Sequence, residues 1–495
     1  MPAHRSFFIL TFGCQMNVYD SGRLRSLLVG NGWVEAASGE EARFIFLNTC
    51  SIREKAANRV IVRLRELGPL KKKNPGLIIA VGGCVAEQEG VDLLGKAPMV
   101  DLVVGPRRLS EIPPLLNSWK PGTGPLVLSG DPPENPLRPR DDAPFGEYPV
   151  RPADSPERSP VSAFVTIMEG CDNHCAYCVV PRLRGRERSR SREDVLREVR
   201  ALAAGGTREV TLLGQNVNSW GSGGPASAPR RPEPFPALLR EAAEIPGVLR
   251  LRFTTSHPKD TSDELAELFG TLDKLCPHIH LPLQSGSDRV LSLMGRRYSR
   301  ERYLSVAKAL RAARPGIAIT SDIIVGFPGE TEEDFRKTME TLEESRFDSV
   351  FSFKYSDRPG TKAPSFPGKV PEEVKGRRLE ELIKLQKKIS LSVNAGLLGT
   401  DEEVLVEGPG REPSQLSGRT GTFKIVNFAI PPGFPDEDPK RPSESDPAAD
   451  PAAVVPPGSL VAVTVTGTGP VSLKGTLKRI LDIPHRPARA ARERI

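Results

Sequence analysis

The stretch Gly170-Cys171-Asp172-Asn173-His174-Cys175-Ala176-Tyr177-Cys178 places three cysteines within eight residues, directly after an apolar strand-like segment. From there to about residue 395 the sequence alternates apolar strands with amphipathic helical patterns, which indicates parallel β/α units. The predicted strands span 163–168, 209–213, 249–254, 278–283, 317–324 and 349–353. Such units form a complete or partial (β/α) barrel, whose active site opens at the carboxyl ends of the strands. The cysteine loop therefore lies where a barrel carries its chemistry.

The spacing of these three residues, called here the loop cysteines (Cys171, Cys175 and Cys178), indicates an open metal centre. Three thiolates are one fewer than a closed zinc or iron–sulfur site takes. The Cys-x3-Cys-x2-Cys spacing allows one short loop to bind three irons of a 4Fe-4S cube, which leaves the fourth iron for a small ligand. A zinc site would need a fourth ligand, for which His174 is the only nearby candidate. The pattern favours the iron–sulfur interpretation, with zinc as the alternative.

Three further cysteines, called here the sheet cysteines (Cys14, Cys50 and Cys84), each follow a predicted strand by one to three residues. These strands span 6–11, 44–48 and 77–81. Because helical patterns separate the strands, residues 4–125 are predicted to form a doubly wound parallel sheet, whose carboxyl edge binds ligands. The sheet cysteines are therefore predicted to meet there and to hold a second open cluster. The alternative is three small buried thiols, a common role of cysteine.

Proline-rich segments divide the chain into three blocks. Residues 126–160 combine prolines with charged residues and are predicted to be a linker between the sheet domain and a barrel at 161–395. Short β-rich runs predict a small antiparallel β-barrel at 396–482. A proline-rich stretch within it, 431–457, is predicted to be a long surface loop, and a basic tail follows at 483–495. The overall fold class is α/β with a terminal β-barrel.

The composition is that of a cytoplasmic globular protein. The chain has 495 residues, of which 38% are hydrophobic, and no stretch approaches the roughly 18 apolar residues of a membrane span. The amino terminus lacks a signal-peptide core. Cysteines in such a chain are metal ligands or catalytic groups more often than disulfides. We expect a monomer without membrane contact, and the net charge of +7 is a weak indication of a polyanionic partner.

The loop cysteines together with Tyr177 resemble the signature of radical S-adenosylmethionine (SAM) enzymes. The match extends along nearly the whole chain to the methylthiotransferase family. The motifs in the first block are Thr11-Phe12-Gly13-Cys14-Gln15-Met16-Asn17, Asn48-Thr49-Cys50-Ser51-Ile52-Arg53-Glu54-Lys55-Ala56 and Gly82-Gly83-Cys84. Those in the second block are Arg184-Gly185-Arg186-Glu187-Arg188-Ser189-Arg190, His280-Leu281-Pro282-Leu283-Gln284-Ser285-Gly286-Ser287 and Gly326-Phe327-Pro328-Gly329-Glu330-Thr331. The third block, with Ser417-Gly418-Arg419-Thr420 and Lys424-Ile425-Val426-Asn427-Phe428, resembles the RNA-binding TRAM domain of that family.

The resemblance implies two 4Fe-4S clusters and two uses of SAM. The sheet cysteines would hold an auxiliary cluster, at which one SAM molecule methylates a bound sulfur. The loop cysteines would hold the cluster that cleaves a second SAM molecule to a 5′-deoxyadenosyl radical. That radical would remove the hydrogen at carbon 2 of an adenine, where the methylthio group is then added. A reducing donor such as a flavodoxin or ferredoxin is implied, and no catalytic side chain is assigned.

Three motifs resemble the branch of the family that acts on isopentenyladenosine beside the anticodon of tRNA. They lie at residues 50–55, 213–219 and 355–361. The nearer alternatives are a methylthiotransferase for another modified tRNA adenosine or for an aspartate of a ribosomal protein. The remote alternative is a non-catalytic, zinc-stabilised RNA-binding protein.

Polar and aromatic side chains near predicted strand ends are candidate cofactor contacts. They are Tyr177, Gln215, Asn216, Gln284 and Ser285. Hydrogen bonding within turns or the barrel rim is the alternative for the polar members.

Arginines alternate along residues 182–192, and an extended strand would place them on one face as a positive stripe suited to phosphate. The predicted RNA contacts are Arg184, Arg186 and Arg188 in this stripe, and Arg419 and Lys424 in the third block. A solvated or ion-paired edge is the alternative.

Overall fold

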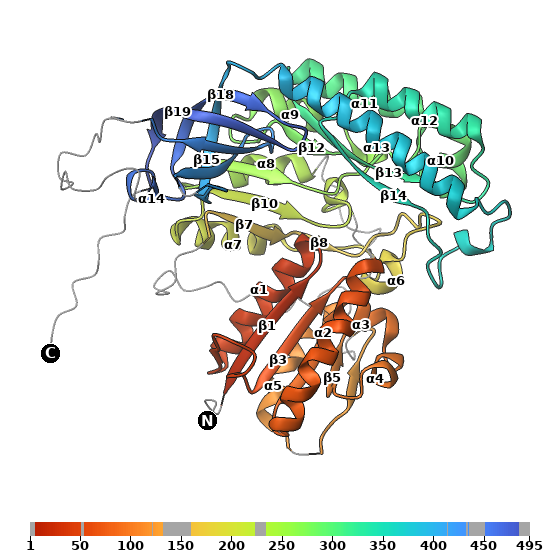
Figure 1. The fold of residues 1–495 in the computed structure, drawn as a ribbon, viewed down its shortest axis with the longest axis vertical. Helices are drawn as coiled ribbons and strands as arrows, with labels where there is room; N and C mark the ends of the chain where they lie inside the picture. Colours follow the sequence, from red (N-terminus) through yellow and green to blue (C-terminus); the bar gives the residue numbers. More distant parts are fainter. Residues whose placement is uncertain are drawn as a thin grey trace.

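The computed structural model contains a parallel-sheet domain, a central barrel and a small β-barrel, in chain order (Figure 1). The structure describes residues 5–50, 54–120, 122–131, 160–222, 234–412, 414–431, 434 and 451–484. Most of the predicted linker, most of the predicted 431–457 loop and nearly all of the predicted basic tail lie outside these residues. Within the described ranges, no helix has the length and apolar character needed to cross a membrane.

The amino-terminal domain is a six-stranded sheet in which all strands run parallel, in the order β2-β1-β3-β4-β5-β6. Its strands are β1 (Ser6–Phe12), β2 (Val34–Glu35), β3 (Phe44–Thr49), β4 (Ile78–Gly83), β5 (Leu102–Val104) and β6 (Leu126–Leu128). Its helices are α1 (Gln15–Gly30), α2 (Glu54–Lys73), α3 (Cys84–Glu89), α4 (Asp92–Lys96), the 3-10 helix η1 (Pro106–Glu111) and α5 (Ile112–Ser118).

Successive side chains of β3 point into two separate cores, one on each face of this sheet. Phe44 and Phe46 pack in the core that includes α1 and α5, whereas Ile45 and Leu47 pack in the core that includes α2. A strand that is buried on both faces requires helices on both sides. The doubly wound arrangement is confirmed.

The edge strands β2 and β6 were not predicted. β6 pairs with β5 and lies inside residues 126–160, which we predicted to be linker. The sheet domain therefore includes β6, and the predicted boundary at residue 125 is wrong, because a three-residue strand carries too little pattern to stand out from a proline-rich context.

The central domain is a row of six parallel strands in two ladders, β7-β10-β11 and β12-β13-β14, with β11 beside β12. Its main strands are β7 (Ser162–Thr166), β10 (Glu209–Leu213), β11 (Arg250–Phe253), β12 (His278–His280), β13 (Ala318–Val325) and β14 (Ser349–Lys354), and β8 (Met168–Glu169) and β9 (Arg188–Ser189) form a short hairpin. Its helices are α6 (Val180–Arg184), α7 (Arg192–Ala204), α8 (Pro234–Glu244), α9 (Asp263–Thr271), α10 (Asp288–Met294), α11 (Arg300–Ala313), α12 (Glu332–Ser345) and α13 (Glu372–Ala395). Since β7 and β14 end the row among the described strands, the barrel is partial.

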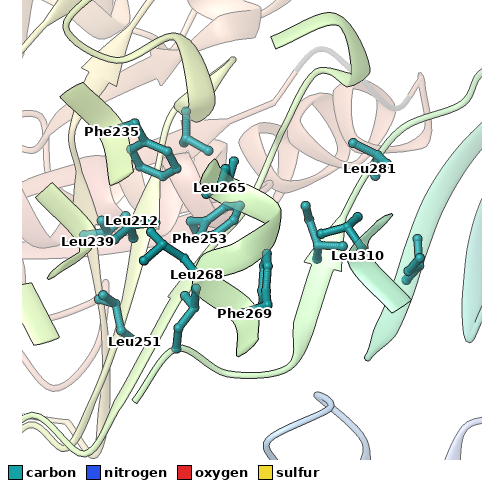
Figure 2. Packing of buried hydrophobic residues seen from close by; sticks show 14 of the residues in the cluster. Leu212, Phe235, Leu239, Leu251, Phe253, Leu265, Leu268, Phe269, Leu281 and Leu310 are labelled. Atoms are coloured by element: carbon teal, nitrogen blue, oxygen red, sulfur yellow. The ribbon is translucent and has the colours of Figure 1, made fainter. Parts of the chain in front are cut away.

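The core of the partial barrel lies between its strands and the outer helices. Figure 2 shows Phe235 of α8, Phe253 of β11 and Phe269 of α9 packed among leucines of the same elements. The rings of Phe235 and Phe253 meet edge to face, with centroids 5.2 Å apart. This burial supplies the main stabilisation of the domain and fixes the strand ends that carry the functional loops.

The carboxy-terminal domain is a closed five-stranded barrel in the order β15-β16-β17-β19-β18. Its strands are β15 (Asp401–Pro409), β16 (Gln415–Thr420), β17 (Ile425–Ala429), β18 (Leu460–Thr468) and β19 (Ser472–Asp482), with a short helix α14 (Pro451–Val454). The pairs are antiparallel as predicted, except that β17 and β19 run parallel and close the barrel.

The turn between β16 and β17 rests on the amino-terminal end of the central barrel. Arg252 of β11 donates hydrogen bonds to the carbonyl oxygens of Thr420 and Gly421, each at 2.7 Å. The ring of Phe423 stacks on that of His278 at the start of β12, with centroids 5.0 Å apart. The small barrel therefore contacts the end of the strands opposite to that of the loop cysteines.

Replacing Arg252 with leucine should lower the free energy of unfolding by about 3–5 kcal/mol. The reason is that Glu209 would keep a buried carboxylate without its partner, since the two side chains are 2.9 Å apart and both are almost inaccessible. Denaturant unfolding of the whole chain measures the change. The matched control, Arg252→Leu/Glu209→Gln, removes the unpaired charge and should recover part of the loss. An unchanged transition in the single variant would contradict the prediction.

Candidate metal centre

The loop cysteines extend from the carboxyl end of β7, beyond the short strand β8. The loop begins at Gly170, whose φ is 77°. A Cβ atom at this position would lie 2.0 Å from the carbonyl oxygen of Arg186, which precedes β9. Only glycine allows the β8–β9 hairpin to approach the loop this closely. The sequence thus fixes the position of the loop at the barrel mouth.

The three loop thiols lie together and are largely shielded from water. Burial raises the pKa of Cys171 and raises that of Cys178 to about 12, and the neighbouring Cys175 raises both further. The amide of Asn173 donates to Cys171 Sγ at 3.4 Å, and Arg296 Nη1 donates to Cys175 Sγ at 3.5 Å. A thiol that becomes a metal ligand loses its proton, and these donors stabilise the sulfur charge that results.

The sheet cysteines follow β1, β3 and β4, which are neighbours in the sheet. Their side chains meet at its carboxyl edge. A hydrogen bond with Cys50 lowers the pKa of Cys14 to about 6, against the effect of burial. Burial raises the pKa of Cys84, and the neighbouring Cys14 raises it further. Three thiols far apart in sequence are thus brought together in space.

Asn17 on α1 ties the loops of the sheet cysteines to one another. Its amide nitrogen donates to Asn48 Oδ1 at 2.9 Å and to the carbonyl oxygen of Thr49 at 3.2 Å, and its oxygen accepts from the backbone N–H of Cys14 at 3.2 Å. Gly83 has a φ of 86°, and a Cβ there would lie 2.4 Å from the carbonyl oxygen of Thr49. Asn17 could not be recognised from sequence, because a single asparagine at the start of a helix has the pattern of a capping residue.

The two sets of cysteines lie on the same domain interface. Cys14 packs against a buried cluster that includes Leu213 of β10, and Cys84 shares a buried cluster with Val179, which directly follows the loop cysteines. In Figure 1, α1 of the sheet domain lies against β7 of the barrel, and α3 lies against α6. The edge of the sheet that carries one set therefore faces the barrel mouth that carries the other.

The spacing within each set differs from that of a single-ion site. Within the described ranges, no three His, Cys, Asp or Glu side chains are close enough to hold one metal ion. A zinc ion draws all its ligands to about 2.3 Å, whereas each thiolate of a 4Fe-4S cube binds an iron of its own. His174, the candidate fourth zinc ligand, is exposed. The donors present fit an open iron–sulfur cluster at each set.

Two predicted cofactor contacts keep a hydrogen-bond acceptor that the protein does not use. Gln215 Oε1 and Asn216 Oδ1 are buried and have no partner among the described residues, while the Asn216 amide donates to Asp260 at 2.8 Å. Ser256 Oγ, after β11, is in the same situation. Ser256 could not be recognised from sequence, because a lone serine belongs to no motif. Buried acceptors without donors are suited to a polar ligand.

Of the other predicted cofactor contacts, one is bonded within the fold and two remain candidates for binding the cofactor. Ser285 is fully buried and its hydroxyl lies 3.3 Å from that of Thr338, so it serves the fold, and its selection as a cofactor contact is wrong. The ring of Tyr177 meets that of Phe327 edge to face, with centroids 6.4 Å apart. Gln284 is buried at the carboxyl end of β12 with a φ of 71°. Tyr177 and Gln284 remain predictions.

The predicted arginine stripe does not form. The first part of the predicted stripe, up to Arg184, is helical and belongs to α6, so its side chains do not alternate as they would in a strand. In addition, Arg184 and Arg190 are buried. Arg184 is therefore not an RNA contact, and that prediction is wrong. Arg186 is exposed and Arg188 is half-buried, and both remain predicted RNA contacts.

Lys424 serves domain docking rather than RNA binding. Its ammonium lies 2.5 Å from Asp348, which precedes β14, and both side chains are largely buried. The prediction that Lys424 binds RNA is wrong, because a contact between domains leaves no local pattern. Arg419 pairs with Glu407 at 2.8 Å, lies over the ring of Phe423 and remains partly exposed, so its RNA role stays a prediction.

Two family models match the chain. The model of the radical SAM superfamily matches residues 165–342, which contain the loop cysteines and most of the barrel. A model described as uncharacterized protein family UPF0004 matches residues 6–105, which contain the sheet cysteines. The two models thus divide where the structure divides its first two domains.

Curated relatives match over most of the chain. A tRNA-2-methylthio-N(6)-dimethylallyladenosine synthase of Geotalea uraniireducens (strain Rf4) is 45% identical over 97% of this chain and 100% of its own length. A synthase of the same name from Pelobacter propionicus is 48% identical over 85% of this chain and 92% of its own. Among solved structures, the radical S-adenosylmethionine methyltransferase TsrM from Kitasatospora setae superposes with a TM-score of 0.53 at 16% identity, over 82% of this chain and 78% of that one. That likeness shows the fold.

Proposed function

This chain belongs to the tRNA-2-methylthio-N(6)-dimethylallyladenosine synthase family, and we propose that it adds a methylthio group to carbon 2 of N(6)-isopentenyladenosine beside the anticodon of tRNA. It is a tRNA methylthiotransferase of the radical SAM class. The observation that carries the finer proposal is the meeting of the two cysteine sets across one domain interface. Two open clusters at this interface would bring the radical source and the sulfur to the same base.

In this proposal each domain has its own task. Residues 4–128 hold the auxiliary cluster on the sheet cysteines. The barrel at 161–395 holds the SAM-binding cluster on the loop cysteines, and the small barrel at 396–482 is the TRAM-like RNA-binding domain. When bound, these groups supply a 5′-deoxyadenosyl radical for hydrogen removal and a methylated sulfur for transfer.

The chain's own residues position the reactants and exclude water. Cys175 and Cys84 are buried, which limits the access of water to both sets, and a cluster formed by Met16 and Tyr19 of the sheet domain with Leu213 of the barrel holds the two domains together beside Cys14. Radical chemistry needs this geometry more than it needs a proton-transfer group, because an exposed radical reacts with whatever it meets first.

The free acceptors of Gln215 and Asn216 suit the ammonium group of SAM. Gln215→Ala and Asn216→Ala should each weaken SAM binding about tenfold to a hundredfold, since a hydrogen bond to a charged group contributes about 1.5–3 kcal/mol. Anaerobic equilibrium dialysis with labelled SAM measures this. Ser285→Ala is the matched control, because that hydroxyl is bonded within the fold. Unchanged SAM affinity in both variants would exclude these contacts.

The substrate assignment is tested by the nucleosides of tRNA. Deleting the gene should remove the methylthio group and leave N(6)-isopentenyladenosine to accumulate, as measured by mass spectrometry. Loss of a methylthio group from a different modified adenosine, or unchanged tRNA with a changed ribosomal protein, would favour the alternative substrates. The proposed partners are tRNA, through Arg186, Arg188 and Arg419, and a reducing protein such as a flavodoxin or ferredoxin.

The two-cluster assignment is tested by metal content. Anaerobically purified and reconstituted protein should contain about eight irons and about eight sulfides per chain. A colourless protein with zinc and almost no iron would favour a zinc-stabilised RNA binder. About four irons would leave one cysteine set without a cluster.

A further inference from the structure

Arg184 reaches from the barrel domain into the sheet domain. It is the last residue of α6, and its Nη2 atom lies 2.7 Å from Oδ2 of Asp20 on α1. The two side chains are only 4% and 2% exposed. A buried ion pair carries a large desolvation cost, which geometry and further hydrogen bonds must offset.

The helix that carries this guanidinium packs against the sheet cysteines. α6 contacts α3, which begins at Cys84, and Leu183, the residue before Arg184, shares a buried cluster with Cys84. In keeping with this placement, the positive charge of Arg184 lowers the pKa of the Cys84 thiol against the larger effect of burial, and it also lowers that of Cys14. The loop that carries the loop cysteines thus continues into α6 and delivers a positive charge to the other set.

One donor of Arg184 is unused. Nη1 is buried and makes no hydrogen bond within the described ranges, and Oε1 of Glu169 lies 4.0 Å from it. An ion pair that only docked the domains would leave such a donor exposed to water or paired. A buried guanidinium N–H that has no hydrogen-bond partner among the described residues, at the end of the helix that packs against Cys84, is suited to an anionic sulfur.

The loop cysteines have a comparable neighbour. Arg296 is buried, donates to Cys175 Sγ at 3.5 Å and is held by the carbonyl oxygen of Pro282 at 3.1 Å. Each cysteine set therefore has one buried guanidinium beside one of its sulfurs. Arg184 differs in that it comes from the domain that does not carry its set.

We propose that Arg184 is a positioning residue that donates to a sulfur of the auxiliary cluster and raises its reduction potential. The proposal rests on the sheet cysteines holding that cluster. Hydrogen bonds to the sulfurs and nearby positive charge favour the reduced, more negative state. Because Arg184 belongs to the barrel domain, the potential then depends on the two domains being docked.

The test isolates the auxiliary cluster in the full-length chain. A parent protein carrying Cys171→Ala, Cys175→Ala and Cys178→Ala is reconstituted anaerobically and titrated with reductant, with electron paramagnetic resonance as the readout. Two derivatives are compared, Asp20→Asn and Asp20→Asn/Arg184→Met. They differ only in the arginine, and neither leaves the Asp20 carboxylate buried without a partner.

The doubly substituted derivative should have a more negative midpoint potential than Asp20→Asn. We expect at least a tenfold change in the reduction equilibrium, which is about 59 mV for a one-electron couple. Asp20→Asn alone should have a more positive potential than the parent, because the guanidinium loses its counter-charge. Equal potentials in the two derivatives would overturn the proposal.

Further measurements distinguish failure of the Arg184 proposal from misfolding of a variant and from failure of the proposed function. If the double derivative does not fold, Asp20→Asn/Arg184→Gln takes its place in the comparison with Asp20→Asn, and an unchanged potential there overturns the proposal. If the parent itself holds no iron, the sheet cysteines bind no cluster and the proposed function fails instead. Arg184→Lys in the same parent, which keeps the charge with a different donor geometry, should keep most of the parent's potential.

Discussion

Cys171→Ala, Cys175→Ala and Cys178→Ala should each abolish SAM cleavage, and with it methylthio transfer. Each thiol is the sole protein ligand proposed for one iron of the cluster, so losing one leaves the cube with two anchors and no stable site for SAM. We expect a loss of more than about a thousandfold, equivalent to about 4 kcal/mol at 1.36 kcal/mol per factor of ten. Anaerobic assays that quantify 5′-deoxyadenosine measure it.

Cys276→Ala is the matched control for these variants. Cys276 is more deeply buried than the loop cysteines, and it lies near Arg252 and Glu209 at the other end of the barrel. It should keep full SAM cleavage and full iron content. Cleavage at the normal rate in any of the three loop variants would show that the cluster is held elsewhere.

Cys14→Ala, Cys50→Ala and Cys84→Ala should keep SAM cleavage and stop methylthio transfer. These thiols lie on the sheet domain, across the interface from the proposed SAM site, so their loss should remove the proposed sulfur carrier and leave the proposed radical source intact. One reaction reports both outcomes, with 5′-deoxyadenosine measured alongside the nucleosides of the tRNA. Iron content should fall from about eight to about four per chain.

The two sets of variants distinguish the roles of the two proposed clusters, because one set should lose SAM cleavage and the other should lose only methylthio transfer. A sheet-cysteine variant that retained normal methylthio transfer would remove the auxiliary cluster from the reaction. One that lost SAM cleavage as well would show that the two sites fold as a unit, so far-ultraviolet circular dichroism is recorded for each variant. Cys276→Ala again serves as the reference.

The positions of the cysteines could be predicted from sequence because they depend on topology. Cys14, Cys50 and Cys84 each follow a parallel strand, and a doubly wound sheet brings such positions to one edge whatever the details of packing. Local pattern was equally sufficient for the barrel strands, whose apolar runs are long. It failed for β2 and β6, which have two and three residues at the sheet edges.

The roles of charged residues could not be predicted in the same way. Alternating arginines suggested a strand, but Pro181 near the start of α6 begins a short helix, which turns Arg184 inward. Lys424 is indistinguishable in sequence from a solvated lysine, and only its ion pair with Asp348 shows its role. Such contacts join domains that are distant in the chain, so no window of sequence contains both partners.

The small barrel contacts the amino-terminal end of the central strands, whereas the loop cysteines lie at their carboxyl end. β13 alone has eight residues, which at about 3.3 Å each amount to roughly 26 Å. A single nucleoside in the barrel mouth cannot touch both ends. Only a polynucleotide long enough to span this distance can therefore bind the small barrel while one of its nucleosides lies in the barrel mouth.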